Sequence, residues 1–395
     1  MVYKMKQQNK VDLVLASTVI LLTLAGPLMV YSASTIFAQN MKIPQPPTYF
    51  FNKQMLWASF SIGALLLISR LPLRHFRTPY RIVALNILSF VLLIVVLLVT
   101  DEIKGAHRWL KLGFANFQVS ELSKLAVILF FSYWLSHKDL SQGGYRETAL
   151  PMFLVLGGTM LLIMIQPDLG TALLLATITL MMVFVSRFRL SYLLATILPA
   201  VPLGAIYLSL RPYQLQRIEN WLHGLSDPLS ASYQVRQSIV AIGSGGFSGL
   251  GFGESKQKLL FLPDAHTDFI FSIISEELGL IGASLLLGAF VLILYRGLRI
   301  ARKAPDTFSQ FLAFGLTLNV VLYAFMNIAV VSGVVPATGI PMPFISYGGS
   351  HMVFMGVNVG ILLSISRSVE TKAGLSKNEN SYSLQRERLN RSLVR

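Results

Sequence analysis

The residues best suited to chemistry lie in one short stretch, just before a long apolar segment begins. This stretch reads Pro263-Asp264-Ala265-His266-Thr267-Asp268-Phe269. Asp268 lies at the mouth of this apolar segment, where water meets an apolar wall. A structural role for Asp268 there is to cap the following helix, and a functional role is the alternative. His266 and Asp268 could also contribute to a metal site, although two ligands are weak evidence for one.

Ionisable residues also surround the start of a second apolar segment. Glu121 and Lys124 are three residues apart, so they share one face of a helix and can form an ion pair. That pair could be structural and fix the packing of the helix. Alternatively, Lys124 or the nearby Arg108 could bind an anion such as a phosphate group in a pocket.

Two further polar sets interrupt apolar segments. The run Gln166-Pro167-Asp168-Leu169-Gly170-Thr171 breaks one segment from the next, and Asp168 could cap the second of the two helices. Prolines and glycines from Pro336 to Pro343 precede Ser346-Tyr347-Gly348-Gly349-Ser350. Irregular backbone at membrane depth is tolerated only against protein or a water-filled cavity, so we expect this segment to form the wall of a pocket.

The elements that position these residues are apolar helices. The chain is 54% hydrophobic and 13% charged, whereas a soluble protein carries about a quarter charged residues. A membrane-spanning helix needs roughly 20 mostly apolar residues. We predict an all-α polytopic membrane protein with about ten such spans, at 12–33, 50–69, 80–100, 118–135, 149–166, 170–186, 190–209, 270–296, 308–333 and 343–366.

The basic residues predict how these spans are oriented. Lys and Arg in short loops tend to remain cytoplasmic. With both termini inside, 22 of the 33 Lys and Arg fall in inner segments, namely 4–10, 70–81, 138–146, 187–189, 296–303 and 367–395. The net charge of +15 is then mostly an orientation signal, which argues against a nucleic-acid partner. All four polar sets fall at outer ends of spans, which predicts chemistry on the extracytoplasmic face.

One long segment between the seventh and eighth spans, about 210–267, is predicted to lie outside. Apolar residues at helical spacing from Leu215 to Leu222 suit a helix in the membrane interface, and 233–242 suits a second short helix. The glycine-rich run 243–253 lacks the Gly-Lys-Ser/Thr ending of a phosphate-binding loop, so we interpret it as tightly turned or flexible backbone. We expect one membrane domain over 1–367 and a disordered cytoplasmic tail over 368–395. The chain has no cysteine, which excludes disulfides and thiolate chemistry.

These motifs together resemble a known family. The resemblance rests on His107-Arg108-Trp109-Leu110, on Gln118 to Lys124, on Gln166 to Thr171, and on Tyr233-Gln234 with Gln237-Ser238. It also rests on Gly243-Ser244-Gly245-Gly246, on Leu262 to Phe269, and on Ile345 to Ser350. In this order they are similar to the SEDS family of bacterial cell-wall proteins, the FtsW/RodA/SpoVE group. Val119 departs from the proline usual in that family, and Asp264 from a common glutamate.

The resemblance implies a peptidoglycan glycosyltransferase in the bacterial cytoplasmic membrane. Such an enzyme polymerises lipid II, takes an undecaprenyl-pyrophosphate-linked glycan, and works with a class B penicillin-binding protein among divisome or elongasome proteins. Asp268 matches the family's essential aspartate, which implies that its carboxylate is the general base of the reaction. The candidate substrate-binding residues are Arg108, Glu121, Lys124, Asp168, Gln234, Ser238, Lys258, His266 and Ser346. No cofactor is demanded, although a divalent cation, Mg²⁺ or Mn²⁺, could help to hold the pyrophosphate.

Two short stretches bear on the branch of the family. Met29 to Ser34 and Gln257 to Pro263 are more similar to the division branch, FtsW, and therefore favour septal cell-wall synthesis. A RodA-type elongation polymerase, a lipid II flippase and a scaffold that recruits a penicillin-binding protein are the alternatives. A flippase should carry charged or broken-helix features near the bilayer midplane, whereas the polar sets here favour one face.

Overall fold

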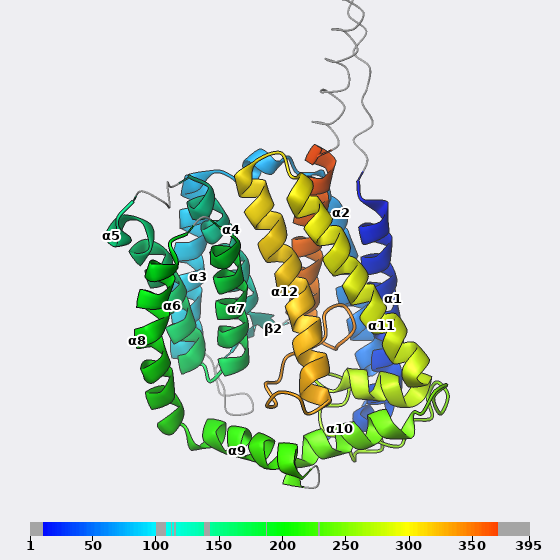
Figure 1. The fold of residues 1–395 in the computed structure, drawn as a ribbon. Helices are drawn as coiled ribbons and strands as arrows, with labels where there is room; N and C mark the ends of the chain where they lie inside the picture. Colours follow the sequence, from blue (N-terminus) through cyan, green and yellow to red (C-terminus); the bar gives the residue numbers. More distant parts are fainter. Residues whose placement is uncertain are drawn as a thin grey trace, which may run out of the picture.

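In the part of the chain that the structure describes, ten helices of 16 residues or more build a bundle (Figure 1). The computed structural model describes residues 11–99, 108–111, 113, 116–137, 143–186, 188–227 and 230–369. The long helices are α1 (Leu13–Gln39), α2 (Tyr49–Arg70), α3 (Pro79–Val99), α4 (Val119–His137), α6 (Leu150–Ile165), α7 (Leu169–Val185), α8 (Leu190–Ser209), α11 (Ile270–Lys303), α12 (Thr307–Val331) and a final helix (Gly349–Val369).

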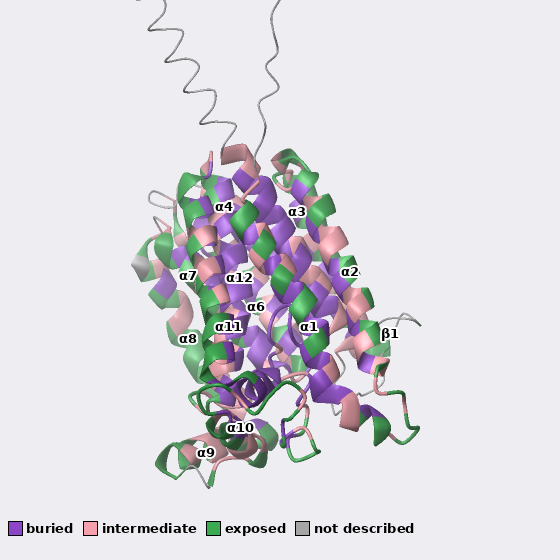
Figure 2. Ribbon diagram, turned by 90° about the vertical axis from the view of Figure 1, so that its right-hand side faces the viewer, coloured by how far each residue is buried: buried purple, intermediate pink, exposed green. Residues whose placement is uncertain are grey.

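The prediction of an all-α protein with many membrane spans is confirmed. Seven of these helices are long and apolar enough to cross a membrane by length and composition, and α6 and α7 are shorter apolar helices. Figure 2 shows buried residues inside the bundle and exposed residues along its outer faces. Many of the exposed residues are large and apolar. A bundle that presents leucine and phenylalanine outward is suited to lipid rather than water as its surroundings.

Shorter elements complete the described part of the chain. They are η1 (Leu73–His75), α5 (Tyr145–Thr148), α9 (Pro212–Ser226), α10 (Tyr233–Ser244) and a hairpin of β1 (Trp109–Lys111) with β2 (Asn116–Gln118). The hairpin is antiparallel, with Trp109 opposite Gln118. Its three-residue strands were not predicted.

The two ends of the described chain lie at one end of the bundle, and α9 and α10 lie across the opposite end (Figure 1). We call this opposite end the loop end. The two short helices predicted within 210–267 are confirmed by α9 and α10. The part of the predicted disordered tail that follows Val369 lies outside the described residues.

Two predicted spans contain irregular backbone in the structure. The last one was expected from 343, but its helix begins at Gly349, because Phe344 has a left-handed φ of 65° and Met342 N–H donates to Ser346 Oγ instead of a helical carbonyl. The eighth was expected as one helix, but α11 contains a break at Gly279, where φ is 64° and ψ is −163°.

Candidate functional site

Asp268 lies in a turn at the loop end, directly before α11. Residues 263–269 form consecutive turns, and the helix begins at Ile270 after the cap residue Phe269. The N-cap position of this helix is Phe269, one residue after Asp268, and the Phe269 side chain makes no capping bond. The Asp268 side chain is half-buried, which is the environment expected of a general base.

The carboxylate of Asp268 faces the irregular segment that follows α12. A Cβ built on Gly339 would lie 3.4 Å from Asp268 Oδ2, and Gly339 itself has a left-handed φ of 70°. Buried Asn327 joins the two segments, since its Nδ2 donates to the carbonyl of Asp268 at 2.6 Å and to that of Ile340 at 2.8 Å. The predicted pocket wall thus lies directly against Asp268.

Ser346 holds this wall to the Asp268 turn rather than facing open space. Its Oγ donates to the carbonyl of Thr267 at 2.6 Å and accepts from Met342 N–H at 2.8 Å. Its carbonyl accepts from Gln54 Nε2 of α2 at 2.9 Å. These contacts make Ser346 a support for the backbone on both sides of the site.

His266 lies in an aromatic cluster. Its ring centroid is 4.9 Å from that of Phe37, 4.8 Å from that of Phe50 and 5.9 Å from that of Tyr347. Burial, and to a smaller extent the neighbouring Tyr49, raises the pKa of Tyr347 to about 12. The Tyr347 hydroxyl therefore remains protonated at neutral pH. Within the described residues no three His, Asp or Glu side chains gather in a way that could hold a metal ion.

Arg108 and Asp168 form a second corner of the site. The Arg108 guanidinium donates to the carbonyls of Gln166, at 3.1 Å from Nε, and Pro167, and its Nη1 lies 4.0 Å from Asp168 Oδ1. Asp168 caps α7 as predicted, accepting from Thr171 N–H at 3.3 Å. The Arg108 side chain is 28% exposed, so a ligand can reach it.

The two corners are joined by the segment after α12. A Cβ built on Gly170 would lie 2.9 Å from Cβ of Thr338, so the start of α7 packs directly on this segment. The next residue, Gly339, faces Asp268. The structure therefore places Asp268 and the start of α7, which carries the Arg108–Asp168 pair, against the same stretch of backbone at Thr338 and Gly339.

Glu121 and Lys124 lie deeper, in a fully buried network. Lys124 Nζ is 2.8 Å from Glu121 Oε1 and also bonds the hydroxyl of Tyr323. The same Glu121 oxygen lies 3.1 Å from Nδ1 of His351. The predicted pair is thus formed, and this buried pair joins α4 to α12 through Lys124 and to the final helix through Glu121. Sequence reasoning missed Tyr323 and His351, because nothing in the pattern reveals partners so distant along the chain.

The remaining candidates lie on α10 and in the segment after it. Ser238 is buried, with its Oγ 2.6 Å from both Ser272 Oγ and the carbonyl of Val331. Gln234 is half-buried one turn earlier. Lys258 pairs with Glu277 at 3.1 Å and is 10% exposed. Ser238 and Lys258 therefore contact protein groups rather than an open cleft.

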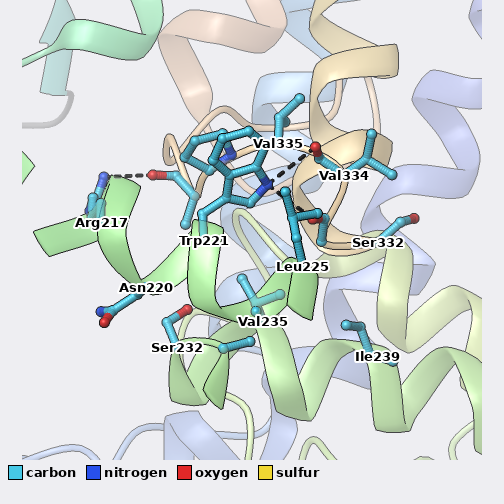
Figure 3. A pocket seen from close by; sticks show the side chains of 15 residues that line it. Arg217, Asn220, Trp221, Leu225, Ser232, Val235, Ile239, Ser332, Val334 and Val335 are labelled. Atoms are coloured by element: carbon cyan, nitrogen blue, oxygen red, sulfur yellow. Dashed lines mark hydrogen bonds between the residues drawn. The ribbon is translucent and has the colours of Figure 1, made fainter. Parts of the chain in front are cut away.

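A pocket of about 260 Å³ lies beside the site, between α9, α10 and the segment after α12 (Figure 3). Arg217 donates to the carbonyl of Ala337 at 2.9 Å, and Trp221 Nε1 donates to those of Gly333 and Val334 at 3.2 Å. The amphipathic helix α9 therefore holds the segment that leads to Gly339. The lining of the pocket is mostly apolar, which suits the apolar part of a lipid.

The fold and site define a polytopic membrane protein with an acidic and basic site at its loop end, and comparison with known proteins identifies its family. The cell cycle protein family FtsW/RodA/SpoVE matches residues 12–371, and this chain belongs to it. The probable peptidoglycan glycosyltransferase FtsW of Trichlorobacter lovleyi is 39% identical, over 91% of this chain and 94% of its own. Stage V sporulation protein E of Bacillus subtilis is 38% identical, over 90% and 97%.

A solved structure supports the same relationship. It describes the structural coordination of polymerization and crosslinking by a peptidoglycan synthase complex. One of its chains has a TM-score of 0.71 and 26% identity, covering 91% of this chain and 98% of that one. The resemblance inferred from the motifs is therefore confirmed over nearly the whole chain.

Proposed function

We propose that this protein is a peptidoglycan glycosyltransferase that polymerises lipid II, with septal cell-wall synthesis during division as its role. Its family membership and its FtsW-named relatives support the reaction and the role. The structural observation that carries the proposal is the half-buried Asp268 carboxylate, which faces Gly339 beside the corner formed by Arg108 and Asp168.

In the proposed reaction the 4-hydroxyl of a GlcNAc attacks the anomeric carbon of a MurNAc. The bond from that carbon to undecaprenyl pyrophosphate breaks as the new glycosidic bond forms. Asp268 accepts the hydroxyl proton, a step worth roughly 10²–10⁴ in rate. Lipid II is α-linked and the glycan β-linked, so one inverting displacement suffices, and no second carboxylate is needed as a nucleophile.

Arg108 is the cation best placed to meet the pyrophosphate. Three carbonyl and carboxylate contacts orient its guanidinium, and part of the side chain stays accessible. Arg suits this role because its planar fork matches phosphate oxygens. Lys124 is fully buried and already paired, so in our proposal it supports the site from beneath. Asp168, Gln234 and His266 remain candidate contacts for the sugar or lipid, and no step depends on a metal ion.

The setting of the reaction follows from the topology. The positive charge of the inner segments supports an orientation with both termini in the cytoplasm and the loop end outside the cytoplasmic membrane. We further propose a class B penicillin-binding protein as partner, since the related solved structure is of a complex that polymerises and crosslinks peptidoglycan.

The function is tested by incubating the purified protein with lipid II in detergent micelles, with and without the partner. Moenomycin is added to silence classical transglycosylases. We expect glycan chains, resolved by gel electrophoresis. Micelles have no second compartment, so flipping cannot produce this signal. Complete absence of polymer, with the partner present, would contradict the enzyme assignment and favour a flippase or a scaffold.

A further inference from the structure

The break in α11 is filled by the glycine-rich run. Across the break, Leu250 N–H donates to the carbonyl of Glu276 and Gly251 N–H to that of Glu277, both at 3.0 Å. In the other direction, Leu280 N–H donates to the carbonyl of Gly246 at 2.9 Å. A Cβ at Gly249 would lie 2.1 Å from the Glu277 carbonyl oxygen, so only glycine allows this approach. The run is therefore an internal backbone support.

The side chain of Glu276, 1% exposed, holds the segment that follows the glycines. Its Oε1 accepts from Lys256 N–H at 3.0 Å, and its Oε2 accepts from Ser255 Oγ at 2.5 Å and from Gln257 N–H at 3.3 Å. Successive backbone N–H groups that converge on one anion form a strong acceptor site. Here the anion is the protein's own carboxylate.

Glu277, also 1% exposed, adds a charged contact to the same segment. Its Oε1 lies 3.1 Å from Lys258 Nζ and accepts from Ser32 Oγ of α1 at 2.6 Å. Lys258 Nζ also donates to Ser32 Oγ at 3.2 Å and to the carbonyl of Gly253. The Lys258 ammonium is therefore surrounded by three acceptors from this protein.

We propose that Glu276, Glu277 and Lys258 form a clamp that positions Asp268. The clamp joins residues 255–258 to residues 276 and 277, and so closes a loop in which Asp268 lies. Closing a loop removes backbone freedom that would otherwise spread the positions of its residues. In this proposal Lys258 is a positioning residue, whereas on the sequence alone it was counted among the candidate substrate-binding residues.

Kinetics separate these two roles for Lys258. According to the clamp proposal, Lys258→Met leaves the buried Glu277 carboxylate without its cation. Glu277→Gln leaves the Lys258 ammonium without its anion. Each single variant should lower kcat roughly tenfold to a hundredfold, because small displacements of a reacting group have effects of that size. The KM for lipid II should stay within about twofold of the wild type, since ground-state binding is untouched.

The double variant Lys258→Met/Glu277→Gln removes both charges and should recover most of kcat. The conservative Lys258→Arg should also retain activity. Lys256→Met is the matched control and should have no effect, because Lys256 contributes only its backbone N–H and its side chain is exposed. A raised KM in Lys258→Met that persists in the double variant would overturn the clamp and make Lys258 a substrate ligand.

The kinetic experiment rests on the proposed function, so a second experiment, on amide hydrogen exchange, tests the clamp without measuring activity. In Ser32→Ala, which removes one hydroxyl from the clamp, amide hydrogen exchange over 255–268 should be faster than in the wild type. Unchanged exchange there would overturn the clamp even if the wild type polymerises lipid II. A wild type that makes no polymer would contradict the proposed function, while the exchange arm would still decide on the clamp.

Discussion

A single methyl group added at Gly339 tests whether the segment after α12 forms the wall of the site beside Asp268. The residue has φ of +70°, where an L-residue costs about 1–2 kcal/mol. Its missing Cβ would lie 3.4 Å from Asp268 Oδ2, an ordinary contact that does not force the backbone to move. Gly339→Ala should therefore fold with a modest loss of stability, and its methyl group should occupy space beside the carboxylate that the substrate hydroxyl needs.

Gly333→Ala is the matched control in the same segment. Its φ of +74° imposes the same backbone cost, but its Cβ would meet Ile239 and Val235 at 3.3–3.4 Å instead of Asp268. We expect both variants to lose about 1–2 kcal/mol of folding stability. Only Gly339→Ala should lose activity, by about tenfold or more, equivalent to about 1.4 kcal/mol in the barrier.

The assay measures polymer formation from lipid II at saturating substrate, together with thermal unfolding of each variant in the same detergent. Equal losses of activity in both variants would show that strain in the segment, and not the space beside Asp268, governs the reaction. Full activity in Gly339→Ala would refute the placement of the reacting hydroxyl against this wall.

Four further outcomes are expected. Glu121→Ala leaves the buried Lys124 unpaired and should lower stability by about 3–5 kcal/mol, seen as low yield or early unfolding; normal yield together with normal activity would show that the pair is dispensable. Ser238→Ala loses two hydrogen bonds of 2.6 Å and should lower stability by roughly 1–3 kcal/mol with little change in KM; a raised KM instead would assign Ser238 to substrate binding. Arg108→Lys keeps the charge but loses the fork, so the KM for lipid II should rise by about tenfold or more in initial-rate measurements, whereas an unchanged KM would remove Arg108 from the pyrophosphate site. Tyr347 should ionise near pH 12 in an ultraviolet titration compared with Tyr347→Phe. Because the pKa of Tyr347 is raised, its contribution to folding stability should be intact below pH 10 and fall between about pH 10 and 12. Ionisation near pH 10 would contradict its burial.

The sequence was a good guide wherever the signal was local. Hydrophobic runs predicted the ten long helices, because a span must be apolar over most of its length. The spacing of three between Glu121 and Lys124 predicted their ion pair, and Asp168 was recognised as a cap from its place after Pro167. Each of these inferences depends on residues that are close together in the sequence.

Features that depend on distant contacts could not be predicted in this way. Tyr323 and His351 join the Glu121 network only because α12 and the final helix pack beside α4. The break at Gly279 gave no clear signal, since a single glycine is common within membrane helices. The role of Glu276 depends on the glycine run folding back across that break. Such pairings require the three-dimensional arrangement of the chain.

The identity of the base is the central claim, and one comparison tests it most directly. Wild-type protein, Asp268→Asn and Asp264→Asn are assayed with lipid II, the partner and moenomycin in detergent. Asp264 lies in the same turn and has φ of +55°, which asparagine also accepts, so Asp264→Asn controls for local disturbance. We predict that Asp268→Asn folds but makes no detectable glycan, while Asp264→Asn retains synthesis. Undiminished synthesis by folded Asp268→Asn would contradict the account.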